Sequence, residues 1–403
     1  MPWKEVTPMD EKVHFISDYL DQLFDFAELC RRYGISRKTG YKYTHRYRED
    51  GFEGLIARSS RPHHSPSKID PKIEQAFVEL KKIRPDRGAK KLIRPYRKKY
   101  PGWHVPSEST VNEILSRNNL VIHRIKTRPQ HPGKPISIAC DSNDLWGVDY
   151  KGPFKTRDGN YCYPLTISDY FSRYIIGCRG LYSPNLEDTK EVFRRVFQEY
   201  GLPQRIRSDN GTPFSSPTMG RLSRLSVWWI RLGIFPELIQ PGAPQQNSIH
   251  ERMHRTLKDA TTRPPASNLP AQQRKFNDFI EDFNYDRPHE ALGQEPPATM
   301  YKPSTRPFPA KLPQVEYPRH FHVRLVSTNG GIMWKHKWVN ITRVLEKEYI
   351  GFEEIDNDIY DVFFGSVLIG RFNSIKGAVI SRRTNYQFDL DYDNMYLHTK
   401  PVT

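Results

Sequence analysis

The chain has 403 residues, a formal net charge of +16 and a hydrophobic content of 37%, which allows two to four ordinary domains with cores of their own. No apolar run approaches the length of a membrane span, and the N-terminus lacks the apolar core of a signal peptide. The basic balance favours a polyanionic partner, with nucleic acid first and an anionic membrane second. The cysteines lie far apart without a C-x-x-C pair, which argues against a disulfide framework or a cysteine zinc site and favours a reducing cytoplasm. They are Cys30, Cys140, Cys162 and Cys178.

Residues 1–60 are expected to form a helix-turn-helix DNA-binding domain. The stretch FAELCRRYGISRKTGYKYTHRY (26–47) reads as two helices joined by a turn at 33–35, with Ser36 placed to N-cap the second helix. Residues 1–136 hold 28 Lys and Arg against 16 Asp and Glu. This excess favours DNA contacts over a plain hairpin with a solvated face. The expected DNA-contacting cations of the second helix are Arg37, Lys38, Lys42 and Arg46.

A second helical unit is expected at 67–125, as another helix-turn-helix or winged DNA-binding domain. Linkers rich in turn-forming residues flank it at 57–71 and 126–136. Ser107 is a natural N-cap for its last helix. Pro95 interrupts a helical pattern, so we expect it to kink or end that helix.

Residues 137–303 change to strands that alternate with amphipathic helices. The order is three antiparallel strands, a helix, two short strands and a helix, which indicates an α/β core of ribonuclease H type. A further helix then leads into a Pro-rich loop. The stretches expected as strands are 145–154, 161–171, 173–182, 204–211 and 233–241, and those expected as helices are 186–201, 245–260 and 271–292.

The C-terminal part is expected to be β-rich, with a small barrel at 313–372 and a polar tail at 373–403. A hairpin is expected at Asn329-Gly330-Gly331. Within this region, Trp334 and its neighbours Lys335 and Lys337 could touch DNA or could simply form a structural hairpin.

The stretch HERMH (250–254) fits H-E-x-x-H, the zinc-binding motif of metalloproteases. On a helical wheel Glu251, His254, Arg255 and Lys258 share a face, while apolar residues occupy another. Arg255 and Lys258 would place positive charge next to a bound zinc ion, which disfavours it. The extended protease motif has a glycine and a histidine at the positions where this chain has Leu257 and Ala260. A zinc site would therefore need a distant third ligand, such as Glu281. We expect no zinc protease, which would bind zinc and have no DNA requirement.

Three carboxylates suit a hard cation better. Asp149 lies within the first hydrophobic strand, where a buried charge needs a partner. Asp209 ends the fourth strand, and Glu251 lies on the helix at 245–260. These three can converge on one divalent site, because Mg²⁺ prefers carboxylate oxygens together with phosphate and water. A lone aspartate at a strand end is more often a turn former, which is how we interpret Asp169.

Asp149, Asp209 and Glu251 resemble the D-D-E triad of the retroviral-integrase-type core. The words RSDNGTPF, LSRLSVWWIRLGI, PGAPQQN–HERMHRTLK and RPHEALGQEPPATMY, and the opening MPWKE, AELCRRYGISRKTGYK and GFEGL, resemble bacterial insertion-sequence transposases. The resemblance covers most of the chain. Two departures are Ser248, where these proteins usually have glycine, and Pro95.

The resemblance implies a multidomain α/β protein with N-terminal helix-turn-helix units, a ribonuclease H-like integrase core of mixed sheet and helices, and a small C-terminal β-barrel. It implies a DDE-type polynucleotidyl transferase with two Mg²⁺ ions, for which Mn²⁺ can substitute, in which Asp149 bridges both ions and Asp209 and Glu251 each complete one. Water would cut the element ends, and the freed 3′-hydroxyl would join them to target DNA. The implied partners are double-stranded DNA, namely terminal inverted repeats and target, and further copies of the chain as a dimer or larger oligomer. The implied location is the bacterial cytoplasm, at the nucleoid.

Other residues of the core have smaller expected roles. Arg255 and Lys258 are expected to hold DNA phosphate beside the metals rather than form a solvated basic face. Asn247 is expected to shape the entry to the catalytic helix, and His289 to be structural. The main rival is an inactive or domesticated sequence-specific DNA-binding protein, which the intact triad disfavours.

Overall fold

The computed structural model describes residues 7–58, 69–121 and 136–381. Its internal contacts divide the chain into two compact units, residues 1–69 and residues 70–403. Most of both predicted linkers lies outside the described residues. None of the helices in the described ranges has the length and apolar content that crossing a bilayer requires.

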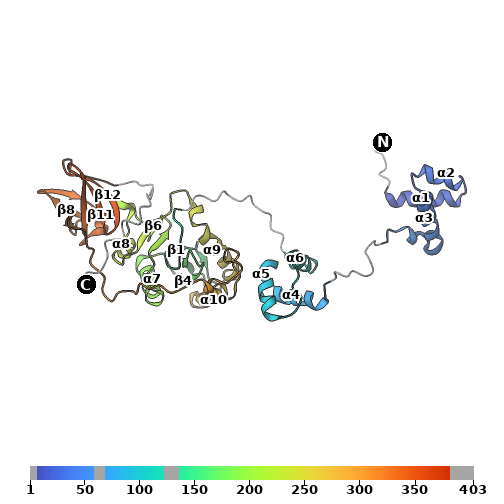
Figure 1. Ribbon diagram of the computed structural model, residues 1–403, viewed down its shortest axis with the longest axis horizontal. Helices are drawn as coiled ribbons and strands as arrows, with labels where there is room; N and C mark the ends of the chain where they lie inside the picture. Colours follow the sequence, from blue (N-terminus) through green and yellow to red (C-terminus); the bar gives the residue numbers. More distant parts are fainter. Residues whose placement is uncertain (1–6, 59–68, 122–135, 382–403) are drawn as a thin grey trace. The chain divides into compact units, whose positions relative to one another are not determined.

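The first unit is a small helical bundle with its own core (Figure 1). The Ser36 hydroxyl accepts a hydrogen bond from the Thr39 amide at 3.2 Å, which confirms the predicted N-cap. Gly40 lets two helices approach closely, because a Cβ there would lie 2.6 Å from the Cys30 sulfur. The helices are α1 (Pro8–Leu20), α2 (Phe26–Arg32) and α3 (Arg37–Asp50), followed by a 3-10 turn (Gly51–Leu55).

The second predicted helical segment lies at the start of the second compact unit and consists of α4 (Pro71–Ile83), α5 (Ala89–Lys99) and α6 (Glu108–Arg117). Ser107 caps α6, as predicted. Pro95 was expected to kink or end its helix, and it does not end it, because α5 continues through it. A proline inside a helix costs about 3 kcal/mol, and packing on both sides offsets this. Leu92 and Tyr96 are fully buried, and the Tyr96 ring stacks on Phe77 at 4.3 Å.

The core sheet combines antiparallel and parallel pairing. β1 pairs antiparallel with β3, and β3 with β4, while β1–β5 and β5–β6 are parallel. The order is β2-β3-β1-β5-β6, with β4 also paired to β3. This confirms the predicted mixed sheet. The strands are β1 (Leu145–Tyr150), β2 (Phe154–Lys155), β3 (Tyr161–Asp169), β4 (Ile175–Leu181), β5 (Arg205–Ser208) and β6 (Phe235–Leu238).

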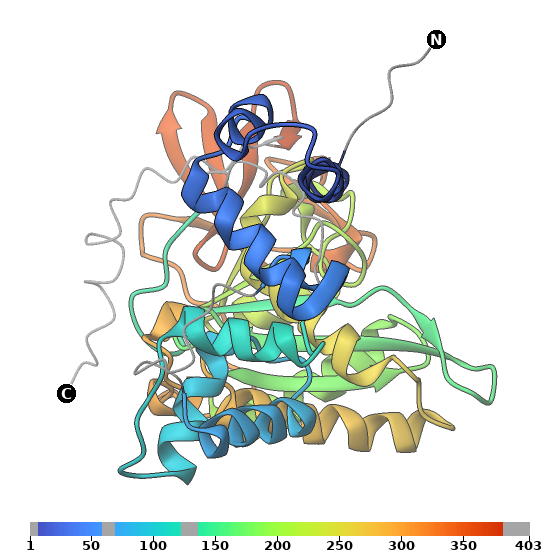
Figure 2. The same cartoon turned by 90° about the vertical axis from the view of Figure 1, so that its right-hand side faces the viewer.

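Helices cover both faces of this sheet. On one face, α7 and α8 pack against Trp146 and Val148 of β1. On the other face, α9 and α10 pack against β4, and Figure 2 shows α10 running beneath the strands. Because side chains alternate along a strand, Asp149 points to the face of α9. The helices are α7 (Leu186–Tyr200), α8 (Arg224–Arg231), α9 (Ser248–Thr261) and α10 (Leu269–Glu281), with short turns at Met219–Arg221, Pro244–Asn247, Asp282–Asp286, Glu290–Leu292 and Pro297–Thr299.

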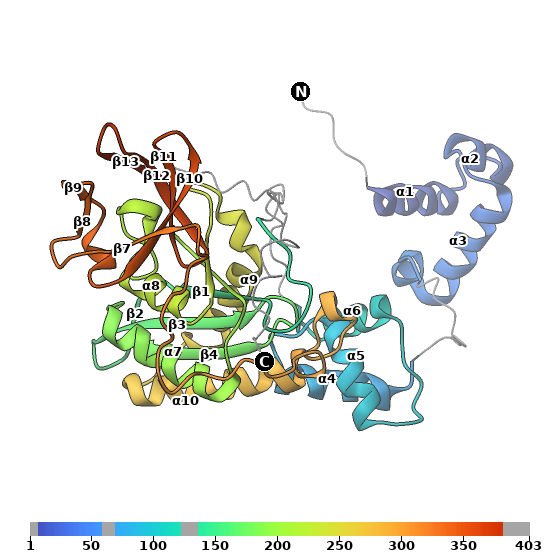
Figure 3. The same cartoon turned by 60° about the vertical axis from the view of Figure 1, so that its left-hand side comes forward.

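The C-terminal strands form two antiparallel sheets around one core (Figure 3). The predicted β-rich region is confirmed, but the strands extend beyond 372 to residue 381, where a polar tail was predicted. Residues 382–403 of that tail lie outside the described residues. The strands are β7 (His322–Leu325), β8 (Gly331–Trp334), β9 (Lys337–Asn340), β10 (Tyr349–Asp356), β11 (Ile359–Phe364), β12 (Val367–Asn373) and β13 (Ala378–Ser381), with a 3-10 turn at Arg343–Leu345.

The predicted hairpin is displaced by a few residues. A tight turn does occupy 327–331, but the β8–β9 hairpin reverses at Lys335 and His336, whose φ angles are +44° and +65°. Trp334 is 4% exposed and packs on Phe352, so it belongs to the core and not to a DNA-contacting surface.

The segment containing α8 belongs to both cores. Trp228 and Trp229 face α7, whereas Val227 and Ile230 contribute to the core of the C-terminal sheets. Arg231 also pairs with Glu348 at 3.2 Å. The core of the mixed sheet and the C-terminal strands are therefore packed against each other through this helix.

Ion pairs connect the second helical unit to the segment that follows α10. Arg87 is fully buried and bonds to Asp282 at 2.8 Å and Asp286 at 2.9 Å. Truncating one partner of a buried pair is costly, so this contact holds α4 and α5 against the core. The other pairs are Arg84–Asp282, Arg84–Asp286, Asp86–Arg287, Lys90–Glu290 and Arg94–Glu295.

Candidate active site

Asp149 and Asp209 lie at the same level on neighbouring strands. β1 and β5 are parallel, and Gly147 pairs with Arg207. Each aspartate is two residues beyond that pair, at the carboxyl end of its strand. Adjacent strands are about 4.8 Å apart, so the two carboxylates come from adjacent points of one sheet edge. The Asp209 carboxylate also accepts a hydrogen bond from the Gly211 amide at 3.0 Å.

Glu251 lies in the first turn of α9, on its exposed side. Arg255 and Lys258 are exposed on the same helix, as predicted. His254 was predicted to share this side, and that is wrong. It is only 6% exposed, because α9 lies against β1 and β3 and both of its histidines face the sheet.

The two histidines of HERMH are hydrogen-bonded to the sheet. The Nε2 atoms of His250 and His254 each lie 2.6 Å from the Thr166 hydroxyl, which donates to the Asp149 carbonyl at 3.0 Å. One arrangement of protons satisfies these contacts: both Nε2–H groups donate to Thr166, and Nδ1 of His250 accepts from Ser168. The histidines therefore clamp α9 onto β3 and are not directed outward as zinc ligands.

Burial keeps both imidazoles neutral. It lowers the pKa of His250 to about 3 and, together with His250, that of His254 to about 2. The Nδ1 atom of His254 lies 3.7 Å from the Asp149 carboxylate. Because the imidazole is neutral, this contact is not an ion pair, and it leaves the charge of Asp149 uncompensated.

The charge of Asp149 is poorly stabilised without a cation. Burial, the neighbouring Asp209 and the more weakly acting Glu251 raise the pKa of Asp149 to about 7. Carboxylates that repel one another in a partly buried site fit a divalent cation. In the described part of the chain, however, no three acidic, histidine or cysteine side chains are gathered closely enough to hold a metal ion. The three carboxylates thus interact electrostatically without forming a preassembled three-ligand site.

Replacing Asp149 with asparagine is expected to stabilise the metal-free fold. A folded pKa raised from 3.8 to about 7 means that ionisation costs stability as pH rises from about 4 to 7. Asparagine avoids this cost, so we expect a gain of about 1–3 kcal/mol above pH 7 and none near pH 4. Thermal unfolding in EDTA across this pH range measures it, with the exposed Asp278→Asn as the control. A gain that did not depend on pH would contradict the electrostatic cause.

A second network, not found from the sequence, holds the start of α9. The Tyr170 hydroxyl donates a short hydrogen bond to the Asn247 side chain. Asn247 is therefore anchored from the residue that follows β3, and its side chain does not cap the helix amides. Gly147 makes room for the Tyr170 ring, because a Cβ there would lie 2.2 Å from a ring carbon.

We expect Gly147→Ala to disturb this anchor and lower both stability and any activity of the site. The buried ring must move, at a cost of about 1–3 kcal/mol. The matched control is Gly152→Ala, since nothing lies within 4 Å of a Cβ there. Melting temperatures and catalytic rates of the two variants give the comparison. Equal behaviour of both would show that the Tyr170 contact has no such role.

An ion pair lies beneath this anchor. Arg207 of β5 forms a short contact with Glu237 of β6, and their side chains are 3% and 2% exposed. Arg207 also donates to the Gln246 carbonyl at 3.3 Å and lies over the Tyr170 ring at 5.2 Å. It therefore connects the sheet to the turn before α9. A charge within a short strand was the only sequence signal for it.

The structure bears on two predicted secondary roles and on one departure from the family pattern. The Asp169 carboxylate accepts hydrogen bonds from the Asn143 and Ser172 amides, so the predicted turn role is confirmed. His289 packs against Phe283 at 4.5 Å, as a structural residue would. Ser248 has φ −57° and ψ −27°, an ordinary helical conformation, so the backbone does not require the glycine usual at this position.

The chain matches known families over three segments. Residues 140–244 and 232–297 each match an integrase core domain. Residues 12–82 match the leucine-zipper of insertion element IS481. In the described part of that last segment, the structure has the separate helices α1 to α4.

Relatives come from insertion elements and retroviruses. The IS476 uncharacterized 39.2 kDa protein of Xanthomonas euvesicatoria is 25% identical over 61% of this chain and 69% of its own length. The IS407 uncharacterized 31.7 kDa protein of Burkholderia multivorans is 27% identical over 41% of this chain and 56% of its own length. The Gag-Pol polyprotein of walleye dermal sarcoma virus is 35% identical over 24% of this chain, which is 5% of the polyprotein.

Solved structures with some likeness include the HTLV-2 integrase catalytic core domain in complex with magnesium, at 16% identity and a TM-score of 0.34 over 41% of this chain and all of that one. The simian T-cell lymphotropic virus intasome with a PP2A regulatory subunit has 14% identity and a TM-score of 0.36, over 72% and 97% of the two chains. The assignment rests on the sequence matches.

The fold and these matches define the class. Residues 140–297 carry an integrase core domain with a mixed sheet of ribonuclease H type. The predicted resemblance to insertion-sequence transposases with a retroviral-integrase-type core is confirmed by the insertion-element relatives. Together these findings support a function of transposase or integrase type.

Proposed function

We propose that this protein is the transposase of an insertion element, which binds the element ends and catalyses Mg²⁺-dependent cleavage and transfer of DNA strands. The observation that carries the proposal is the level placement of Asp149 and Asp209 on neighbouring parallel strands, with Glu251 close enough to act on the Asp149 charge. All three residues lie within the part of the chain that matches integrase cores.

The proposed metal ligands are Asp149, Asp209 and Glu251. Bound Mg²⁺ would supply activation of an attacking hydroxyl and stabilisation of the leaving oxygen. The chain itself would position the reactants: Thr166 and the two histidines hold α9 against β1, so that Glu251 is presented toward Asp149. Because the carboxylates are not preassembled, metal binding would also have to draw them together.

DNA would be held by cations on separate elements. Arg255 and Lys258 are exposed on the helix of Glu251 and are proposed to contact the phosphates next to the reacting one. In the first unit, Arg37, Lys38 and Lys42 are exposed on α3, and Arg46 is half-buried. We propose that α3 reads the element ends and that the unit containing α4–α6 adds further DNA contacts. Joining two ends would require at least a dimer.

The test is a nicking and end-joining assay with DNA that carries the flanks of the gene. The proposal expects cleavage and strand transfer that depend on Mg²⁺ or Mn²⁺ and stop with EDTA. Tight specific binding without cleavage would instead identify a DNA-binding protein that has lost its catalysis. The absence of both DNA binding and cleavage would overturn the proposal.

A further inference from the structure

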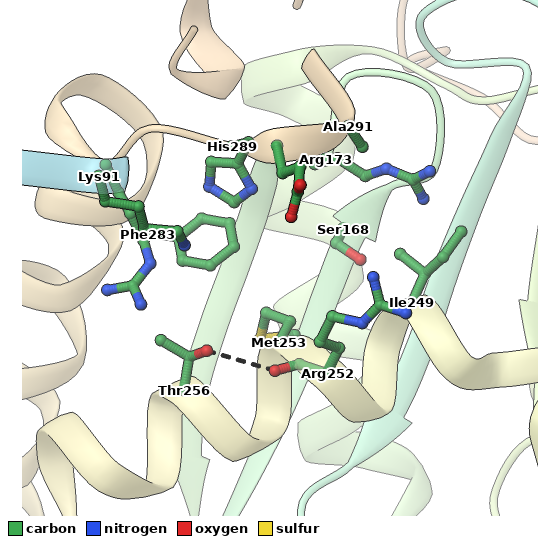
Figure 4. A pocket seen from close by; sticks show the side chains of 12 residues that line it. Lys91, Ser168, Arg173, Ile249, Arg252, Met253, Thr256, Phe283, His289 and Ala291 are labelled. Atoms are coloured by element: carbon green, nitrogen blue, oxygen red, sulfur yellow. Dashed lines mark hydrogen bonds between the residues drawn. The ribbon is translucent and has the colours of Figure 1, made fainter. Parts of the chain in front are cut away.

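A pocket of about 210 Å³ lies on the side of α9 that faces away from Glu251. Arg252, Met253 and Thr256 form its floor, while Glu251, Arg255 and Lys258 are not part of its lining. Figure 4 shows these floor residues on the helix, with His289 and Ala291 on the opposite side of the pocket. The remaining walls come from α5, the β3–β4 turn and the end of the segment after α10.

The lining of this pocket is unusually rich in cations. Lys91, Arg173, Arg252 and Arg287 all contribute to it. Arg287 is paired with Asp86, outside the pocket lining. For Lys91, Arg173 and Arg252 there is no ion pair with any residue in the described ranges.

The single carboxylate among the lining residues does not balance these charges. It belongs to Glu290, which bonds to Lys90 at 2.6 Å. Among the residues that line the pocket, two buried nitrogen atoms have no hydrogen-bond partner in the described structure, namely Nη1 of Arg173 and Nε2 of His289. Buried polar nitrogens are nearly always bonded, so the Arg173 nitrogen lacks a usual partner.

The cations repel one another where they stand. Burial, with the nearby Arg287 charge, lowers the pKa of Lys91 to about 8, and the opposing effects of Asp86 and Glu290 are too small to cancel this shift. Burial also lowers the pKa of Arg173, and Arg252 adds to this effect, while Tyr170 and Asp169 oppose it. Arg173 has φ +66°, a conformation in which residues other than glycine are uncommon. An anion in the pocket would reduce this repulsion.

We propose that this pocket binds a backbone phosphate of the DNA strand that the protein acts on, with Arg173, Arg252 and Lys91 as its ligands. The inference rests on the proposed function and adds to it a contact on the second side of α9. Arg252 directly follows Glu251, so a strand that is bound at the carboxylates and continues around α9 would reach the pocket. The apolar side chains of Met253 and Phe283 beside the cations suit the sugar and base of the same nucleotide.

DNA is favoured over a free phosphate compound by what lies next to the pocket. Beyond Lys91, α5 carries Arg97, Lys98 and Lys99, which have no ion pair with other described residues. These cations continue the positive charge along α5. A DNA strand can contact such an extended positive surface, whereas a small molecule cannot.

The experiment compares full-length wild type with Arg173→Gln, Arg252→Gln and the double variant. The affinity for a labelled duplex that carries the gene flanks is measured at several salt concentrations. Each single variant is expected to weaken binding by about 3–10-fold and to lower the salt slope by about 1. A set of duplexes with single methylphosphonate substitutions then locates the contact. One phosphate whose neutralisation weakens wild type should have no effect on the double variant.

Arg274→Gln is the matched control, because Arg274 is exposed on α10 and its loss removes the same charge. Thermal unfolding of all variants tests the fold, and removal of mutually repelling charges should not lower the melting temperature. If wild type binds and cleaves DNA but the pocket variants behave like Arg274→Gln, the pocket inference fails while the proposed function stands.

If wild type binds no DNA, both ideas fail, and titration with inorganic pyrophosphate shows what remains. Pyrophosphate binding that the double variant loses would assign the pocket to a free phosphate ligand and overturn the DNA contact. No binding would mean that the pocket is not an anion site.

Discussion

Glu251→Gln is expected to reduce Mg²⁺-dependent cleavage and strand transfer by at least about 1,000-fold, or ~4 kcal/mol of transition-state stabilisation. Glutamine keeps the shape of the side chain and removes the charge that a hard cation requires. Glu251 is exposed, so the melting temperature should be unchanged. DNA affinity should also be retained, because it depends on cations elsewhere. The measurement is the nicking and end-joining assay together with DNA binding.

The matched control for this variant is Glu281→Gln. Glu281 is exposed at the end of α10 and loses the same charge, but lies outside the proposed site. It should behave like wild type. Cleavage by Glu251→Gln at the wild-type rate would exclude Glu251 from the proposed triad. Another acid near Asp149 would then have to be the third metal ligand.

Glu237→Leu is expected to destabilise the protein by about 3–5 kcal/mol, the usual cost of leaving one partner of a buried ion pair alone. Glu237 faces Arg207 and also Arg205, at 3.6 Å from the latter. The Ser137 hydroxyl donates to its second oxygen at 2.6 Å. Since Arg207 also supports the turn before α9, activity should fall together with stability. Chemical denaturation measures the change.

The double variant Arg207→Met/Glu237→Leu distinguishes the loss of the whole ion pair from the cost of leaving one charge unpaired. Replacing both charges with apolar side chains should restore much of the stability, because neither charge is then left unpaired. Activity should stay low, since the contact with the Gln246 carbonyl is lost. Glu191→Gln breaks an exposed pair with Arg194 and should cost less than about 1 kcal/mol. If Glu237→Leu lowered the free energy of unfolding no more than Glu191→Gln does, the buried pair would contribute no more to stability than an exposed pair.

The local elements could be predicted because their causes lie within a few residues. Ser36 and Ser107 accept hydrogen bonds from amides three residues ahead, so both caps are visible in the sequence. The amphipathic helix that ends at Gly201 was found for the same reason, since Gly201 adopts φ +79°. The motif around the three acids also identified the integrase core before any geometry was known.

Contacts between distant segments decided the rest. Pro95 lies within a helix because burial of its neighbours outweighs the local penalty, and a sequence window does not contain Phe77, on which Tyr96 stacks. The wheel placed His254 beside Glu251, but the sheet draws it to Thr166. A wheel shows which residues share a face, and only the packed neighbours decide which face is buried.

The sequence by itself determined the acids, the basic N-terminal third and most of the order of strands and helices, since these follow from residue type and local spacing; it missed α8, which lies between β5 and β6. Only the tertiary structure decided that Asp149 stands level with Asp209, that Tyr170 holds Asn247, and that cations from three other segments line the same pocket as Arg252. Each of these depends on side chains between 60 and about 200 residues apart, or on close packing at Gly147. Such contacts are set by how the layers pack, because free energy is gained from burial and charge pairing across the whole fold.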